Sequence, residues 1–227
     1  MTNPFANVLR KLTSLALKSD GGLDAFLADV RGVIHVGANA GQERDLYDRH
    51  GLDVIWIEPI PDVFAELERN IVGYPRQRAF QGLFSNRHGD EIELKIANNN
   101  GASSSILDFG EHKEIWPEVK YTDTLSLKSQ TLAWFLRHHK IDAAAYDALV
   151  VDTQGSELLI LQGAGEALRN FRYIKTEAAD FEAYRGGCTL KDLDAFLRVR
   201  GFTEVRRDAF AQNKTGGTYF DVLYVQA

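Results

Sequence analysis

The chain has 227 residues, of which 44% are hydrophobic and 26% charged, as in an ordinary soluble globular protein. Its formal net charge is -6 at pH 7, and its Lys and Arg residues form no basic stripe. Because nucleic-acid binding depends on clustered Lys and Arg, we expect no nucleic-acid partner. The single cysteine, Cys188, excludes an intrachain disulfide and fits a reducing compartment. No stretch approaches the roughly 18 apolar residues of a membrane span, so we predict a cytoplasmic protein.

The first 31 residues predict a helical segment that precedes the main domain. Apolar residues recur at helical spacing over residues 4–18, and a Ser-Asp-Gly-Gly run then breaks the pattern. Residues 23–30 predict a second short helix. We therefore divide the chain into an N-terminal helical segment, residues 1–31, and one large domain, residues 32–227.

From residue 32 onward, strand patterns alternate with helix patterns. Buried strands are expected at residues 33–36, 54–57, 79–84, 149–152 and 173–177. Helical stretches are expected at residues 41–50, 61–71, 131–140, 157–170 and 190–200. Strands separated by single helices indicate βαβ units and therefore a parallel sheet.

Other segments depart from this alternation. Residues 91–96 alternate polar and apolar side chains, as in a half-exposed strand. Residues 98–124 have no regular pattern, and a connection of that length is typically a functional loop or lid. Residues 202–206 and 219–225 predict a terminal antiparallel pair. We therefore predict an α/β fold with a mostly parallel, seven-stranded sheet whose last strand is antiparallel.

A glycine-rich turn follows the first strand of the domain. Gly37 and Gly41 let a ligand approach the backbone, and the helix that follows is expected to offer free N–H groups. Glu58 ends the next strand, about 20 residues after Gly37, where a carboxylate can hold two ribose hydroxyls. The turn lacks the middle glycine of the dinucleotide-binding pattern. This difference favours a nucleoside ligand without a pyrophosphate, such as S-adenosylmethionine.

A second group of polar residues follows later strands. Asp152 ends the strand at residues 149–152, in the crevice where open α/β sheets bind ligands. Ser156 and Glu157 suit the start of the helix that follows. Glu177 ends the next strand. If the site carries out proton transfer, Asp152 is the first candidate base and Glu177 the second.

Together these residues resemble the pattern of the FkbM-family methyltransferases. The shared motifs are Val36-Gly37-Ala38-Asn39 with Gly41, Glu58-Pro59 followed by Pro61, Asp152-x-x-Gly155-x-Glu157, Leu161-x-Gly163-Ala164, and Glu177. The resemblance covers roughly residues 33–205 and implies a Rossmann-like methyltransferase fold with S-adenosylmethionine as the methyl donor. It further implies a small-molecule or glycan acceptor, methylated on a hydroxyl of a sugar, a glycolipid or a polyketide-type natural product.

The resemblance, with the turn and strand-end residues above, gives an expected cofactor site. Its residues are His35, Gly37, Asn39, Gly41, Glu58 and Asp152. The carboxylates of Asp152, Glu157 and Glu177 could also ligate a divalent cation, but we expect no metal.

Two residues depart from the family's pattern. His35 stands where the family usually has an acidic residue that helps to hold the amino-acid end of the cofactor, and Val150 stands where a lysine is common. Two alternatives to an S-adenosylmethionine-dependent O-methyltransferase therefore stay open. One is a non-catalytic S-adenosylmethionine-binding module, and the other is an NAD-dependent oxidoreductase that binds a pyrophosphate at the glycine turn.

Overall fold

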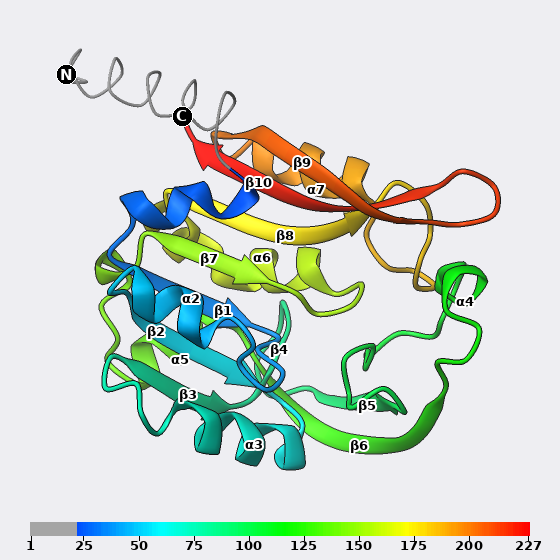
Figure 1. The fold of residues 1–227 in the computed structure, drawn as a ribbon, viewed down its shortest axis with the longest axis horizontal. Helices are drawn as coiled ribbons and strands as arrows, with labels where there is room; N and C mark the ends of the chain where they lie inside the picture. The colour runs from blue at the N-terminus through cyan, green and yellow to red at the C-terminus, as the bar shows by residue number, and fades with distance from the viewer. Residues whose placement is uncertain (1–21) are drawn as a thin grey trace.

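A seven-stranded sheet organises the computed structural model, which describes residues 22–227 (Figure 1). Its strand order is β3-β2-β1-β7-β8-β10-β9. The parallel strands are β1 (Gly32–Val36), β2 (Asp53–Glu58), β3 (Gln77–Gln81), β7 (Ala148–Val151) and β8 (Tyr173–Ala179). β10 (Thr218–Gln226) runs antiparallel to both of its neighbours, β8 and β9 (Phe202–Gln212). The predicted α/β fold, with its antiparallel last strand, is confirmed.

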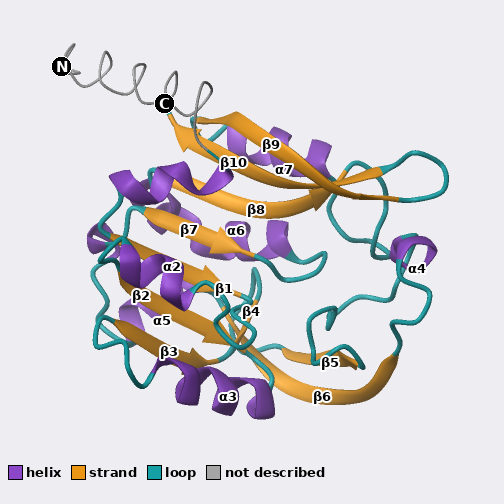
Figure 2. Cartoon of the chain, viewed as in Figure 1, coloured by secondary structure: helices purple, strands orange, loops and turns teal. Residues whose placement is uncertain are grey.

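Helices cover both faces of this sheet (Figure 2). One face carries the 3-10 helix η1 (Leu23–Asp29), α2 (Arg44–Arg49) and α3 (Pro61–Ile71). The other carries α5 (Leu132–His138), α6 (Glu157–Ala164) and α7 (Leu190–Arg198), with the short 3-10 helices η2 (Ala143–Ala145) and η3 (Gly165–Asn170) nearby. Strand side chains alternate between the two faces, so each face has its own apolar core.

A smaller sheet projects beyond the carboxyl ends of the parallel strands (Figure 1). Its order is β4 (Leu83–Phe84), β6 (Tyr121–Gln130) and β5 (Glu91–Ala97). The prediction of a half-exposed strand at residues 91–96 is confirmed by β5. The prediction that residues 98–124 have no regular structure is wrong at two places, because α4 (His112–Ile115) lies within them and β6 begins at residue 121. Most side chains of β6 are exposed or half-buried, so its sequence carries little apolar alternation.

Three further expectations differ from the structure or fall outside it. The expected strand at residues 79–84 is interrupted between β3 and β4, and α2 begins at Arg44 rather than at residue 41. The expected helix at residues 4–18 lies outside the described residues, while the one at residues 23–30 is η1. The domain boundary after residue 31 stays a prediction.

Within the described part of the chain, no helix has the length and apolar character needed to cross a bilayer.

The turn after β1 packs directly against the turn after β7. A Cβ atom on Gly37 would lie 1.7 Å from the carbonyl oxygen of Asp152, and Gly37 also has a φ of +84°. The N–H of Asp152 donates to the carbonyl of Val36 at 3.0 Å. Only glycine fits this contact, which holds the carboxyl ends of the two strands side by side.

We expect Gly37→Ala to destabilise the protein by more than about 3 kcal/mol, because its methyl group overlaps backbone that must then move. Gly201→Ala is the matched control. The φ of Gly201 is also positive, at +85°, but nothing lies within 4 Å of the added Cβ. This substitution should therefore destabilise the protein only by the roughly 1–2 kcal/mol that a left-handed backbone conformation costs a residue with a side chain. Urea unfolding measures both losses. Equal losses would contradict the steric requirement for Gly37.

Candidate functional site

A cavity of about 280 Å³ opens at the carboxyl ends of β1, β2 and β7. This volume is near the lower end of the roughly 300–1,000 Å³ that is typical of small-molecule sites. The structure brings together most of the residues predicted for the cofactor site. Those that line the cavity are His35, Gly37, Asn39, Glu58 and Asp152.

The cavity has an apolar part and a polar part. Apolar side chains come from the loop after β2, from β4 and β5, and from the loop that follows them; they are Ile60, Leu83, Phe84, Leu94 and Ile106. The polar part is formed by Gln42, Glu43 and Gln154 together with the predicted residues. A ligand that fits here combines a flat apolar portion with polar or charged groups.

Glu58 is buried at the end of β2 and is held in a fixed orientation. Its Oε1 accepts the N–H of Ile60 and its Oε2 accepts the N–H of Asn39, each at 2.9 Å. A carboxylate has about four acceptor positions, so two remain for a ligand's hydroxyls. Burial raises the pKa of Glu58 to about 7, although both backbone hydrogen bonds oppose the shift.

The glycine turn differs from the sequence-based expectation. The N–H groups of residues 37–41 all donate within the protein, that of Gly37 to the carbonyl of Ile57 at 3.0 Å. The N–H groups of the turn itself are therefore already used within the protein, and the expectation of free N–H groups at the start of the following helix stays a prediction. Gly41 lies outside the cavity lining, where a Cβ atom would be 2.7 Å from a methyl carbon of Leu67.

Gln154 joins the two carboxylates that were predicted to be catalytic. Its Nε2 donates to Oδ1 of Asp152 at 2.7 Å and to Oε2 of Glu177 at 3.3 Å. The hydroxyl of Tyr184 donates to Oε1 of Gln154 at 2.7 Å and thereby fixes the orientation of the amide. Gln154 has a φ of +57°, and the hydroxyl of Ser105 donates to its carbonyl at 2.7 Å. Sequence reasoning missed Gln154, since neither its backbone conformation nor its contact with Glu177 has a sequence signal.

Asp152 and Glu177 form a buried, interacting pair. Burial raises the pKa of each carboxyl, and for Glu177 the negative charge of Asp152 raises it further. Glu177 does not line the main cavity but a smaller one, next to Tyr184 and Tyr219, and Gln154 borders both cavities. The amide of Gln154 therefore separates the two cavities.

Glu157 closes the turn after β7. Its carboxylate accepts the N–H groups of Thr153 and Gly155, each at 3.0 Å, and only 3% of the residue is exposed. These bonds give Glu157 a structural task at the start of α6. Residues 22–227 contain no group of three or more His, Cys, Asp or Glu side chains arranged to hold a metal ion.

His35 is buried and neutral and forms part of the cavity wall. Its Nδ1 lies 3.2 Å from the hydroxyl of Tyr47, and its ring centroid lies 5.0 Å from that of Trp56. Burial lowers its pKa to about 4, although the negative charge of Glu43 opposes the shift. At neutral pH the imidazole therefore carries no charge.

The ionised groups on the cavity wall are all acidic. Glu43, Glu58 and Asp152 line it, whereas no Lys or Arg of the described chain does. An anionic ligand would be favoured by cations on the wall, and the described lining residues include no Lys or Arg. Its charge suits a ligand that carries positive charge.

Comparisons with known proteins agree with this architecture. A family model described as the methyltransferase FkbM domain matches residues 35–204. An uncharacterized protein from Listeria monocytogenes serotype 4b has a similar fold, with a TM-score of 0.50 and 8% identity over 88% of this chain and 65% of that chain. The METTL16 methyltransferase domain also has a TM-score of 0.50, with 12% identity over 98% of this chain and 67% of that chain. This chain thus spans about two thirds of each of these structures.

A comparison with curated proteins found no significant match. The family match alone covers more than half of the chain, from β1 into β9. The resemblance seen in the sequence motifs is thereby confirmed. The chain belongs to the FkbM methyltransferase family.

Proposed function

We propose that the protein transfers the methyl group of S-adenosylmethionine to a hydroxyl oxygen of a sugar, a glycolipid or another natural product. The observation that carries the proposal is the acidic, cation-free wall of the cavity at the strand ends of an FkbM-family sheet. S-Adenosylmethionine carries a sulfonium and an ammonium group, which complement this wall. NAD carries a pyrophosphate, and the glycine turn has no N–H groups left to hold it.

The residues present fit this cofactor. Glu58 would accept hydrogen bonds from the ribose hydroxyls, and the apolar wall that includes Ile60 and Leu94 would contact the adenine. Asp152 and Gln154 would border the sulfur end, where the bound cofactor supplies an electrophilic methyl group.

The pair formed by Asp152 and Glu177 is suited to take the acceptor's proton. A carboxylate whose pKa is raised toward neutrality is a stronger base than an exposed one. The amide of Gln154 keeps both carboxylates in place while the proton moves to either oxygen. We assign the proton of the acceptor hydroxyl to this pair, with Asp152 as the group nearer the cofactor cavity.

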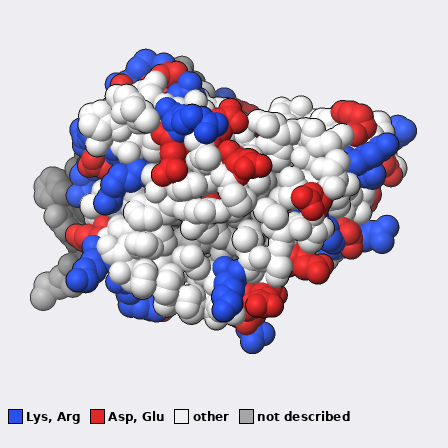
Figure 3. All heavy atoms as spheres, turned by 90° about the horizontal axis from the view of Figure 1, so that it is seen from below, with Lys and Arg blue, Asp and Glu red and all other residues white. Residues whose placement is uncertain are grey.

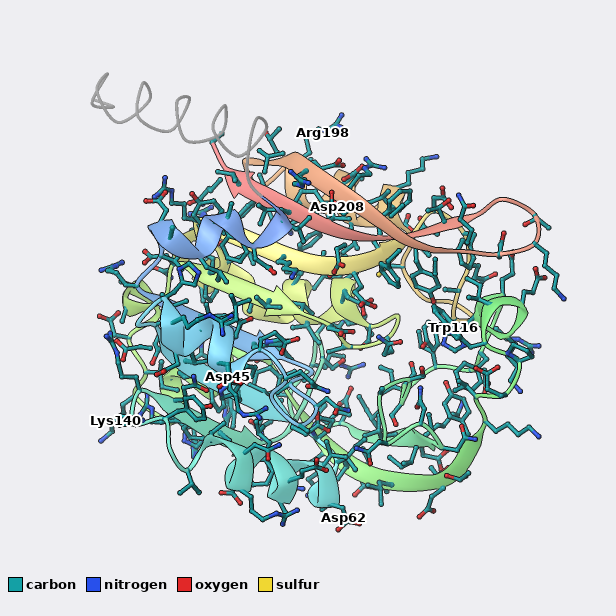
Figure 4. The ribbon with its side chains drawn as sticks, viewed as in Figure 1. Asp45, Asp62, Trp116, Lys140, Arg198 and Asp208 are labelled. Atoms are coloured by element: carbon teal, nitrogen blue, oxygen red, sulfur yellow. The ribbon has the colours of Figure 1, made fainter. Side chains whose placement is uncertain are left out.

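Aromatic side chains beyond Asp152 and Gln154 support a ring-shaped acceptor. Tyr184 and Tyr219 line the smaller cavity together with Glu177, and Trp116, at the end of α4 (His112–Ile115), packs 5.5 Å behind the ring of Tyr219 (Figure 4). Apolar aromatic faces suit the flat faces of sugars.

The surface charge also favours a small acceptor over a nucleic acid. On the face shown in Figure 3, Lys and Arg lie among acidic side chains instead of forming one basic patch. A phosphate backbone would require such a patch.

Glu58→Gln should weaken the binding of S-adenosylhomocysteine by about 30-fold, because losing one charge-assisted acceptor costs roughly 2 kcal/mol. Isothermal titration calorimetry measures the change. Glu68→Gln, an exposed position on α3, is the matched control and should bind like the wild type. If Glu58→Gln binds equally well, the cofactor site lies elsewhere.

The affinity for S-adenosylhomocysteine should rise between about pH 6 and about pH 8. The pKa of Glu58 is raised to about 7, so the ligand-free carboxyl is mostly protonated at the lower pH and ionised at the higher one. The ionised form accepts both ribose hydroxyls, so binding at low pH must first release a proton. Titration at both pH values should show a smaller rise in Glu58→Gln. A wild-type affinity that does not change with pH would contradict this account.

Activity is tested by incubating the protein with S-adenosylmethionine and a panel of sugars, glycolipids and hydroxylated natural products, with mass spectrometry of the products. O-methylated product supports the proposal, whereas methylation at nitrogen or carbon contradicts it. Cofactor binding without any product across the panel would favour the non-catalytic module.

With an acceptor identified, Asp152→Asn should lower kcat by about 10²- to 10⁴-fold, the usual contribution of a general base. Its affinity for S-adenosylhomocysteine should change little, because asparagine keeps the size of the side chain. Parallel loss of binding and turnover would make Asp152 a cofactor ligand. Turnover within a few-fold of the wild type would leave Glu177 as the base.

A further inference from the structure

Glu43 is the carboxylate on the cavity wall that accepts no hydrogen bond and forms no ion pair among the described residues. It lies one residue before α2, is half-buried and lines the polar part of the cavity. Glu58 accepts two backbone N–H groups, and Asp152 accepts the amide of Gln154. In the region from residue 22 to the C-terminus, no hydrogen-bond donor or ion-pair partner reaches the carboxylate of Glu43.

The position of Glu43 distinguishes it from the other acids of this segment. Asp45, labelled in Figure 4, is exposed and accepts the hydroxyl of Tyr74. Asp48 is exposed on α2, and neither aspartate lines the cavity. Glu43 is therefore the acid of this segment that a ligand in the cavity would meet.

Neither His35 nor Lys175 supplies a negative charge that could bind the ligand's cation. His35 is neutral and bonded to Tyr47. Lys175, the cation whose charge acts on both His35 and Glu43, forms its ion pair with Asp24 at 2.8 Å and none with Glu43. A half-buried carboxylate that faces a cavity without a counter-charge is favoured when the ligand supplies one.

We propose that Glu43 binds the ammonium group of the amino-acid part of S-adenosylmethionine, supplying the negative charge that His35 does not. This inference rests on the proposed function. Glu58, Gly37 and Glu43 all line the same cavity, so a nucleoside whose ribose is held by Glu58 shares that cavity with the carboxylate of Glu43. The negative charge expected at position 35 from the family's pattern is thus provided eight residues later, from the segment that leads into α2.

The test compares two ligands that differ only at the proposed contact. S-Adenosylhomocysteine carries the ammonium group, whereas 5′-methylthioadenosine keeps the nucleoside and the thioether but lacks the amino-acid part. Calorimetry measures both affinities for the wild type, Glu43→Gln and Glu58→Gln. Asp48→Asn, an exposed acid on the same segment, is the matched control, and circular dichroism checks that each variant is folded.

Glu43→Gln should weaken S-adenosylhomocysteine by about tenfold, and 5′-methylthioadenosine by less than about twofold, because only the first ligand loses a charge-assisted hydrogen bond. Glu58→Gln should weaken both ligands, and Asp48→Asn neither. If Glu43→Gln weakens both ligands equally, or neither, the proposal for Glu43 is overturned while the proposed function stands. If the wild type binds neither ligand, the proposed function fails, and the role of Glu43 fails with it.

Discussion

The backbone contact between Gly37 and Asp152 is the constraint on which the rest of the site depends. A methyl group added at Gly37 would overlap the carbonyl oxygen of Asp152. The two turns can therefore pack this closely only if residue 37 is glycine. This contact brings the end of β1 against the end of β7. Because β2 pairs with β1 on its other side, Glu58 and Asp152 then face the same cavity.

The carboxylates on the cavity wall determine which ligands the cavity favours. Buried carboxylates without counter-ions are costly, and the protein satisfies two of the three on the cavity wall with neutral donors. Backbone N–H groups hold Glu58, and the amide of Gln154 holds Asp152. Neutral donors orient a carboxylate without cancelling its charge, so each carboxylate is negative once it is ionised. The acidic wall therefore favours a positively charged nucleoside over a pyrophosphate.

The sequence was sufficient to predict the main sheet and the strand-end residues. The runs of apolar residues and the turn residues that follow them mark where β1, β2 and β7 end. In a parallel sheet those carboxyl ends lie at the same edge. For that reason Glu58 and Asp152 could be placed in one crevice before the structure was known. β6 was missed because its apolar alternation is short, with Leu125 and Leu127 half-buried and most other side chains exposed.

Other features of the site depend on contacts between distant segments, which no local pattern records. N–H groups of the glycine turn are used by the carbonyl of Ile57 and by Glu58, both from the next strand. Gln154 acts through a left-handed backbone conformation that brings its amide to Glu177 on the neighbouring strand. Glu43 lines the cavity from the segment before α2, which begins three residues later than the pattern predicts.

The central claim is that the cavity binds a cationic nucleoside that lacks a pyrophosphate. Separate calorimetric titrations of the wild-type protein with S-adenosylmethionine and with NAD test it most directly. The account predicts saturable binding of S-adenosylmethionine and no measurable binding of NAD under the same conditions. Binding of NAD with equal or higher affinity, or no binding of S-adenosylmethionine, would contradict it.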